Sequence, residues 1–140
     1  MNEKEKQLLL KYLCMALPYG IICQHTTYGL PITVTHKLGL GGIENFRHDF
    51  VEIKPYLRSM SSMSKEQRKE YIKVASFDLH ETINGRHYEY YYTSYVGSED
   101  GDLLPNYDAI DWLLKEHFDF NDLIKNGLAI EVTEENNPYK

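Results

Sequence analysis

Cysteine is scarce in this sequence of 140 residues, and its scarcity excludes several classes of protein. The only two cysteines, Cys14 and Cys23, have a spacing that matches no zinc or redox motif. Cys14 lies in an apolar helical run, where a free cysteine behaves as a small hydrophobe. The spacing gives no reason to expect a disulfide, and whether the two cysteines ever pair stays open.

Long hydrophobic runs are also missing, because the longest apolar stretches are far too short to cross a bilayer as a helix. No segment has the pattern of a secretory signal peptide. We therefore expect a soluble protein of a reducing cytoplasm that has no membrane partner.

Complete catalytic and metal-binding motifs are absent as well. His80 and Glu81 begin the zinc-protease pattern, but Asn84 stands in the place of its second histidine. The glycine-rich residues 39–42 lack both the third glycine of a dinucleotide-binding loop and the Lys-Ser/Thr end of a P-loop. We interpret these glycines as a mobile turn between strands, and we expect neither a metal nor a cofactor.

Positive charge is scarce in the last third of the chain. Residues 99–140 contain eleven acidic and three basic residues, a net charge of −8, whereas residues 1–98 carry a net charge of +2. An acidic surface repels phosphate backbones, which disfavours nucleic acid as a partner, and it attracts basic proteins. The alternative, that this charge only keeps the protein soluble, stays open.

The length of the chain predicts a single domain over residues 1–140, because a chain of this size buries roughly two thirds of its surface around one core. Apolar residues at helical spacing predict an N-terminal helix that ends at Pro18 and Gly20. These apolar residues are Leu8, Leu9, Tyr12, Leu13 and Ala16.

Alternating β-branched and polar residues predict a hairpin whose strands are residues 21–26 and 32–37. A further strand over residues 50–53 is expected to end before Pro55, which pushes the preceding residue out of helical geometry. Ser64 and Gln67 fit a capping box, which predicts a central helix to about residue 74. The serines before this helix have no activating base nearby, so we interpret them as a joint rather than as nucleophiles.

The second half of the chain predicts a hairpin at Asn84 and Gly85, two helices and a final strand. The hairpin arms are residues 74–83 and 86–96, the helices are residues 107–118 and 121–126, the strand is residues 128–132, and the frayed tail is residues 133–140. The predicted fold class is α+β: a small curved antiparallel sheet or partial barrel with an N-terminal helix, a central helix and C-terminal helices.

The arm over residues 86–96 has an unusual concentration of tyrosine. Side chains alternate between the two faces of a strand, so Tyr88, Tyr90 and Tyr92 share one face. Tyrosine favours strands and protein interfaces, and exposed rings beside a cation such as Arg86 also stack on single-stranded bases. Core packing, a protein contact and base stacking are thus three alternatives, and Tyr88, Tyr90, Tyr92 and Arg86 are the candidate partner-binding residues.

The same hairpin supplies an alternative catalytic pair. If its arms pair simply, His80 lies close to Glu89 across the strands, and a histidine with a glutamate is the minimum for acid–base catalysis. Together with Glu81 or His87, the pair would suit a small hydrolase or a nucleotide-handling enzyme. A cross-strand polar pair on a solvated face is the simpler explanation.

Three stretches of the chain, LPYG at residues 17–20, IKPYLRSMSSMSKEQ at 53–67 and DWLLKEHFDFNDLIKNGLAIEV at 111–132, resemble a known group of proteins. This is a large group of small uncharacterised proteins of Bacteroides-type gut bacteria, their mobile elements and their tailed phages. The resemblance implies an accessory gene product that acts in a bacterial cytoplasm, and it brings no catalytic residues with it. Small accessory proteins of this kind often bind a host or phage protein and alter it, including components of defence systems.

The leading hypothesis is therefore a non-enzymatic accessory protein that binds a protein partner. The alternatives are the small hydrolase or nucleotide-handling enzyme and a protein that binds single-stranded nucleic acid through the tyrosine-rich strand. A homodimer formed by pairing of edge strands is a further expectation, because a small sheet must protect its edges.

Overall fold

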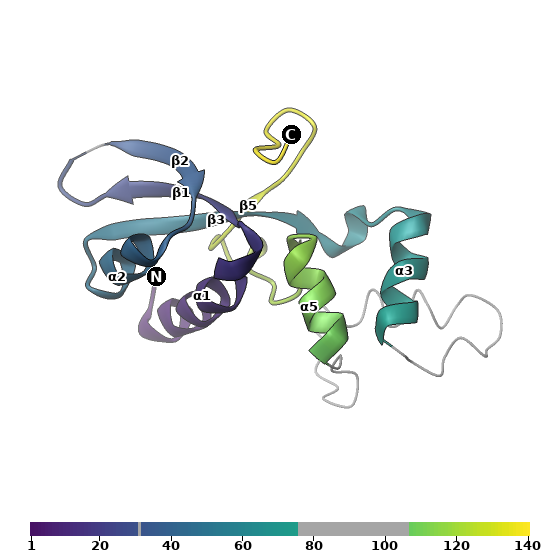
Figure 1. The fold of residues 1–140 in the computed structure, drawn as a ribbon. Coiled ribbons are helices and arrows are strands. Elements are labelled where there is room, and N and C mark those ends of the chain that lie inside the picture. Colours follow the sequence, from purple (N-terminus) through teal and green to yellow (C-terminus); the bar gives the residue numbers. More distant parts are fainter. Residues whose placement is uncertain (31, 76–106) are drawn as a thin grey trace. The chain divides into compact units, whose positions relative to one another are not determined.

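The structure is a computed structural model that describes residues 1–30, 32–75 and 107–140 (Figure 1). The chain divides into two compact units, of which the first comprises residues 1–57 and 123–140 and the second residues 58–122. Strand β3 (Val51–Ser59) begins in the first unit and ends in the second. The single domain predicted for residues 1–140 stays a prediction.

The first unit begins with helix α1 (Glu3–Ala16), as the sequence predicted. Asn2 caps it: its side chain accepts from the amide of Glu5 (2.8 Å), and the Glu5 carboxylate accepts from the amide of Asn2 (2.9 Å). The helix ends through the 3₁₀ turn η1 (Leu17–Tyr19) and Gly20, whose φ of 71° lies in the left-handed region that glycine adopts easily. Its buried side chains are Leu9, Tyr12, Leu13 and Ala16.

Strands β1 (Ile22–Thr27) and β2 (Thr33–Lys37) form the predicted hairpin, and β1 also pairs antiparallel with β3. The strand order is β2-β1-β3, with the short strand β5 (Ile130–Glu131) parallel to β3. The buried face of β1 carries Cys23 and His25, and Ile53 of β3 lies beside His25 in the register.

The expected end of the third strand before Pro55 is wrong, because β3 continues through the proline to Ser59. The Tyr28 amide donates to the Phe50 carbonyl (3.1 Å), so these two residues form a hydrogen-bonded pair in the register of β1 and β3. Hydrogen-bonded and non-hydrogen-bonded pairs alternate along antiparallel strands. Pro55 therefore belongs to a non-hydrogen-bonded pair, and the N–H that proline lacks is not needed by β1.

The expected mobile turn at residues 39–42 is also wrong, because these residues begin helix α2 (Leu40–Arg47). Gly39 occupies the N-cap position without a side-chain cap. Ile43 and Phe46, one turn apart on the helix, are both buried. The burial of these two side chains outweighs the cost of glycine in a helix, which is about 1 kcal/mol per residue relative to alanine.

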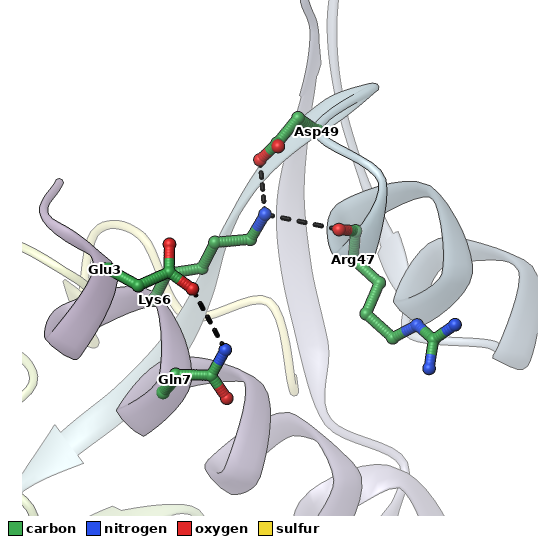
Figure 2. Close-up of polar contacts among 5 residues, drawn as sticks. All are labelled: Glu3, Lys6, Gln7, Arg47 and Asp49. Carbon is green, nitrogen blue, oxygen red and sulfur yellow. Dashed lines mark hydrogen bonds and ion pairs between the residues drawn. The ribbon is translucent and has the colours of Figure 1, made fainter.

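One lysine joins α1 to the end of α2 (Figure 2). The Lys6 ammonium donates to the main-chain carbonyl of Arg47 (3.2 Å) and to the carboxylate of Asp49. Because the C-terminal end of a helix carries partial negative charge, a cation at this position is favourable. In the same part of α1, the Gln7 side chain donates to the Glu3 carboxylate (3.1 Å).

The C-terminal segment of the first unit differs from its prediction in two ways. The expected helix over residues 121–126 is wrong: Asp122 has a φ of 56°, and only a single turn follows, closed by Gly127 with a φ of 74°. The expected frayed tail is wrong as well, since the Tyr139 hydroxyl donates to the carbonyl of Tyr56 (2.8 Å) and accepts from the amide of Ile22 (3.1 Å). The last residues are thus attached to β1 and β3.

The second unit contains the 3₁₀ turn η2 (Met60–Ser62), α3 (Lys65–Ala75), α5 (Tyr107–Lys115) and β4 (Phe118–Asp119), which pairs parallel with the end of β3. The capping box is confirmed: Gln67 donates to the Ser64 hydroxyl (3.1 Å), and the Gln67 side chain accepts from the amide of Ser64 (2.9 Å). Helix α5 ends before the predicted residue 118, because His117 adopts a left-handed φ of 62°.

The α+β class is confirmed. The described residues form four α-helices and a sheet that is open, with helices near both ends of the chain. The sheet is mixed rather than purely antiparallel, because β4 and β5 each run parallel to β3. The predicted hairpin at Asn84 and Gly85 lies outside the described residues.

Candidate functional site

The candidate partner-binding residues Tyr88, Tyr90, Tyr92 and Arg86 and the candidate catalytic pair His80 and Glu89 all lie within residues 76–106, outside the described part of the chain. Their roles therefore stay predictions. The described residues present a different candidate surface, which the first unit builds at the β1–β2 hairpin.

Strand β2 is the outer strand of the sheet, and all five of its residues are exposed. Within the described ranges it pairs with β1 alone. A strand in this position leaves a row of main-chain N–H and C=O groups open to another chain, which is why natural edge strands are usually protected.

The hydrogen bonds of the hairpin determine which main-chain groups of β2 point away from β1. Thr27 donates to the carbonyl of Ile32 (3.1 Å), and Leu38 donates to the carbonyl of Ile21 (2.9 Å). Both bonds involve even-numbered positions on the β2 side, and hydrogen-bonded pairs fall on every second residue of antiparallel strands. The even-numbered residues of β2 therefore point their main-chain N–H and C=O groups toward β1. The outward groups belong to Thr33, Thr35 and Lys37.

Large apolar side chains gather around the same hairpin. We call them the hairpin surface, and they are Tyr28, Leu30, Ile32, Val34 and Phe50, each between 46% and 61% exposed. The hydrogen bond from Tyr28 to Phe50 holds the turn of the hairpin beside the start of β3. Scattered exposed apolar residues are ordinary, but a concentration of them at one hairpin favours an interaction site.

Two histidines connect the strands of the hairpin. His25 of β1 and His36 of β2 stack with ring centroids 3.9 Å apart and planes 11° apart. Their Nδ1 atoms lie 3.2 Å from the Cys23 carbonyl and 2.9 Å from the Lys37 carbonyl, respectively. A carbonyl oxygen only accepts, so each neutral ring carries its hydrogen on Nδ1 and leaves Nε2 as an acceptor.

His25 is the contact between the hairpin and α2. Only 6% of the residue is exposed, and its Nε2 has no hydrogen-bond partner within the described residues. A Cβ atom on Gly42 would lie 3.3 Å from this Nε2, so glycine allows the helix to approach closely. Burial lowers the pKa of His25, His36 lowers it further, and the hydrogen bond to Cys23 partly opposes both.

The geometry of the two stacked rings does not suit a shared metal ion. A bound metal lies along the nitrogen lone pair at about 2.0–2.1 Å, and the lone pairs of two nearly parallel rings do not converge on such a point. The described ranges contain no cluster of three or more side chains suited to a metal ion. His25 packs against α2 at Gly42, and His36 stacks on it from β2.

Acid is expected to destabilise the protein through His25 and His117. Burial and the nearby Arg58 lower the pKa of His117 from 6.5 to about 4, and the pKa of His25 is also lowered. Below about pH 6.5 these histidines bind protons more readily in the unfolded state than in the folded state. Their contribution to the free energy of unfolding is therefore complete above that pH and is lost as the pH drops toward 4. Urea denaturation at several pH values above about 5, where most carboxylates stay ionised, measures this fall.

The His25→Gln variant is the control for this pH dependence. It removes one titrating group, so its urea midpoint should fall less steeply with acid than that of the natural chain. An unchanged slope would show that His25 does not contribute.

The two cysteines are expected to differ in reactivity. Cys14 is exposed on α1, whereas Cys23 is buried and burial raises its pKa to about 12. Because the thiolate is the nucleophile, a disulfide reagent should label one thiol in the folded protein and both after denaturation. A Cys14→Ser variant should lose the labelling of the folded state; persistent labelling would contradict the burial of Cys23.

The second unit has a groove of about 620 Å³ between α3 and α5. Its charged residues have both signs, and Glu70 already accepts a hydrogen bond from the Trp112 indole (2.8 Å). This hydrogen bond joins α5 to α3.

Comparison of the chain with protein-family models, with curated proteins and with solved structures gives no match. In the described ranges, no helix has both the length and the apolar character needed to span a bilayer. The hairpin surface and the free edge of β2 are therefore the features on which a function can be argued.

Proposed function

We propose that this is a non-enzymatic protein that binds another protein, and that the hairpin surface makes the contact. The observation that carries the proposal is the coincidence of two features at one hairpin: a fully exposed edge strand, and five exposed apolar side chains on the hairpin or beside it. Apolar side chains supply binding free energy when a partner removes them from water, at about 25 cal/mol per Å². The main chain of the edge strand adds directional hydrogen bonds.

The biological setting of this binding is proposed from the resemblance of residues 17–20, 53–67 and 111–132 to accessory proteins of phages and mobile elements of Bacteroides-type bacteria. In that setting the partner is a host or phage protein whose action is altered, including a component of a defence system. The hydrolase and nucleic-acid alternatives depend on residues 80–92, which are outside the described ranges, and no observation here favours either.

Affinity purification of the tagged chain from such a host, followed by mass spectrometry, tests the proposal. The informative comparison is between a Leu30→Ser/Ile32→Ser variant and a Tyr90→Ser/Tyr92→Ser variant, both confirmed to be folded by circular dichroism. We expect the first variant to lose the captured protein and the second to retain it.

The opposite result would move the contact to the tyrosine-rich strand. A Lys125→Ser variant serves as the control, since it changes an exposed residue of the same unit outside the hairpin. If all variants capture the same protein, the hairpin surface does not bind it.

A further inference from the structure

We infer that the partner at the hairpin contributes an extended segment, which pairs with the free edge of β2 as an additional strand. Apolar side chains occupy every second position of this segment, and a carboxylate lies beside Lys37. The inference names the chemistry of the partner's contact and thus rests on the proposed function. It follows from three properties of β2: its free main-chain groups, its two rows of side chains and its charge.

The free main-chain groups of β2 belong to Thr33, Thr35 and Lys37, which point away from β1. No main-chain group within the described ranges pairs with them. The Lys37 carbonyl lies 2.9 Å from His36 Nδ1 and keeps a second lone pair. Donors and acceptors that alternate along an edge match another extended main chain, whereas the main-chain groups of a helix are used within the helix. The edge of β2 therefore selects an extended segment.

The side chains of β2 form two rows of different character. Because side chains alternate along a strand, Val34 and His36 lie in one row and the residues with free main-chain groups lie in the other. Val34 lies opposite His25, which is buried, but Val34 itself is 46% exposed. Ile32, whose carbonyl accepts from the amide of Thr27 (3.1 Å), continues the row of Val34 and is 53% exposed. A segment paired with the edge continues both rows, so it presents apolar side chains beside Val34 and polar ones in the other row.

The charge of the edge favours a segment that carries a carboxylate. Residues 30–43 contain no acidic residue and a single basic one, Lys37. Lys37 is exposed and makes no ion pair with the part of the chain that the structure describes. A carboxylate directly opposite a lysine is a favourable cross-strand pair, whereas a second cation in that place is unfavourable. Since Lys37 is the last residue of β2, an antiparallel segment carries this carboxylate at its amino end.

A synthetic peptide tests the inference in the full chain. The probe EVTVT, acetylated and amidated, places its glutamate opposite Lys37 and its valines in the row of Val34 when it pairs antiparallel. NMR titration of the isotope-labelled protein should shift the main-chain amides of Thr33, Thr35 and Lys37, and their exchange with solvent should slow. The amides of Val34 and His36 already lie in the ladder with β1 and should change less.

Methylated forms of the same peptide are the matched controls. A methyl group on the amide nitrogen of the central threonine removes the hydrogen bond to the Thr35 carbonyl, so this peptide should lose its binding. A methyl group on the amide nitrogen of the second valine points away from β2, so this peptide should still bind. The peptide KVTVT places an ammonium group opposite Lys37 and should bind several-fold more weakly than EVTVT.

Three results would overturn the inference. The first is a titration that leaves the amides of Thr33, Thr35 and Lys37 unshifted, and the second is equal binding of the two methylated peptides. The third is a natural chain that sediments as a dimer and becomes a monomer in a folded Thr35→Pro variant, because a second copy of the chain would then occupy the edge.

The Thr35→Pro variant also separates this inference from the proposed function. Proline lacks the outward N–H group, and it is tolerated on an edge strand. We expect this variant, confirmed to be folded by circular dichroism, to lose the protein that the natural chain captures. If it retains that protein while the Leu30→Ser/Ile32→Ser variant loses it, the inference fails and the proposed function stands. If both variants retain the protein, both fail.

Discussion

Phe118→Ala is expected to lower the free energy of unfolding by about 3–5 kcal/mol, because it removes a large ring from a fully buried site. Phe118 stacks on Trp112 with ring centroids 5.7 Å apart, and Trp112 contacts Tyr71 at 5.6 Å. A cavity at Phe118 therefore removes the support of Trp112 as well. Proteins are stable by only about 5–15 kcal/mol, so the variant should be close to the limit of folding.

The measurement is urea denaturation followed by tryptophan fluorescence, since Trp112 is the only tryptophan and lies against the substituted ring. Phe50→Ala is the matched control: Phe50 is exposed, and its loss should change stability by less than about 0.5 kcal/mol. Equal effects of the two substitutions would contradict the burial of Phe118.

Leu13→Ala is expected to cost about 2–5 kcal/mol, because Leu13 is fully buried on the inner side of α1. The same substitution at Leu40, which is exposed at the start of α2, should have little effect. Thermal denaturation followed by circular dichroism compares the two variants. A Leu13→Ala variant as stable as the Leu40→Ala variant would show that α1 does not pack as described.

The Leu13→Ala variant also tests the prediction of a single domain. Leu13 belongs to the first unit and Trp112 to the second. If residues 1–140 unfold as one cooperative domain, Leu13→Ala lowers the urea midpoint reported by Trp112 fluorescence. If the units unfold independently, circular dichroism detects the loss of stability and Trp112 does not.

Local chemistry made several elements predictable from the sequence. The capping box of Ser64 and Gln67 depends on residues three apart, and the end of α1 depends on Pro18 and Gly20, so both could be predicted without knowledge of the rest of the fold. The β1–β2 hairpin was predictable for the same reason, because alternation of side chains is a local pattern.

Other elements depend on distant contacts and were not predictable in this way. Helix α2 begins in a run of glycines, and it forms because Ile43 and Phe46 are buried by residues remote in sequence. Pro55 is accommodated only because β1 pairs with β3 in a register that does not use its missing N–H. Tyr139 is held by main-chain groups of residues 22 and 56, which no pattern near the tail indicates.

The candidate site was predictable in part. The strands of the hairpin were expected, but the exposure of β2 depends on its place at the end of the strand order, which is a property of the whole sheet. One local indication was present: Tyr28, Leu30 and Ile32 continue the apolar pattern through a turn, where polar residues are usual.

The division of the chain into units has a consequence for its synthesis on the ribosome. The first unit needs residues 123–140, which supply β5 and Tyr139, but these are made only after the whole second unit has been translated. At about 5–20 residues per second, the nascent β1–β2–β3 ladder waits roughly 4–14 s for its last strand. During that interval the second unit is being translated, and the growing chain exposes strand edges that a ribosome-associated chaperone would protect.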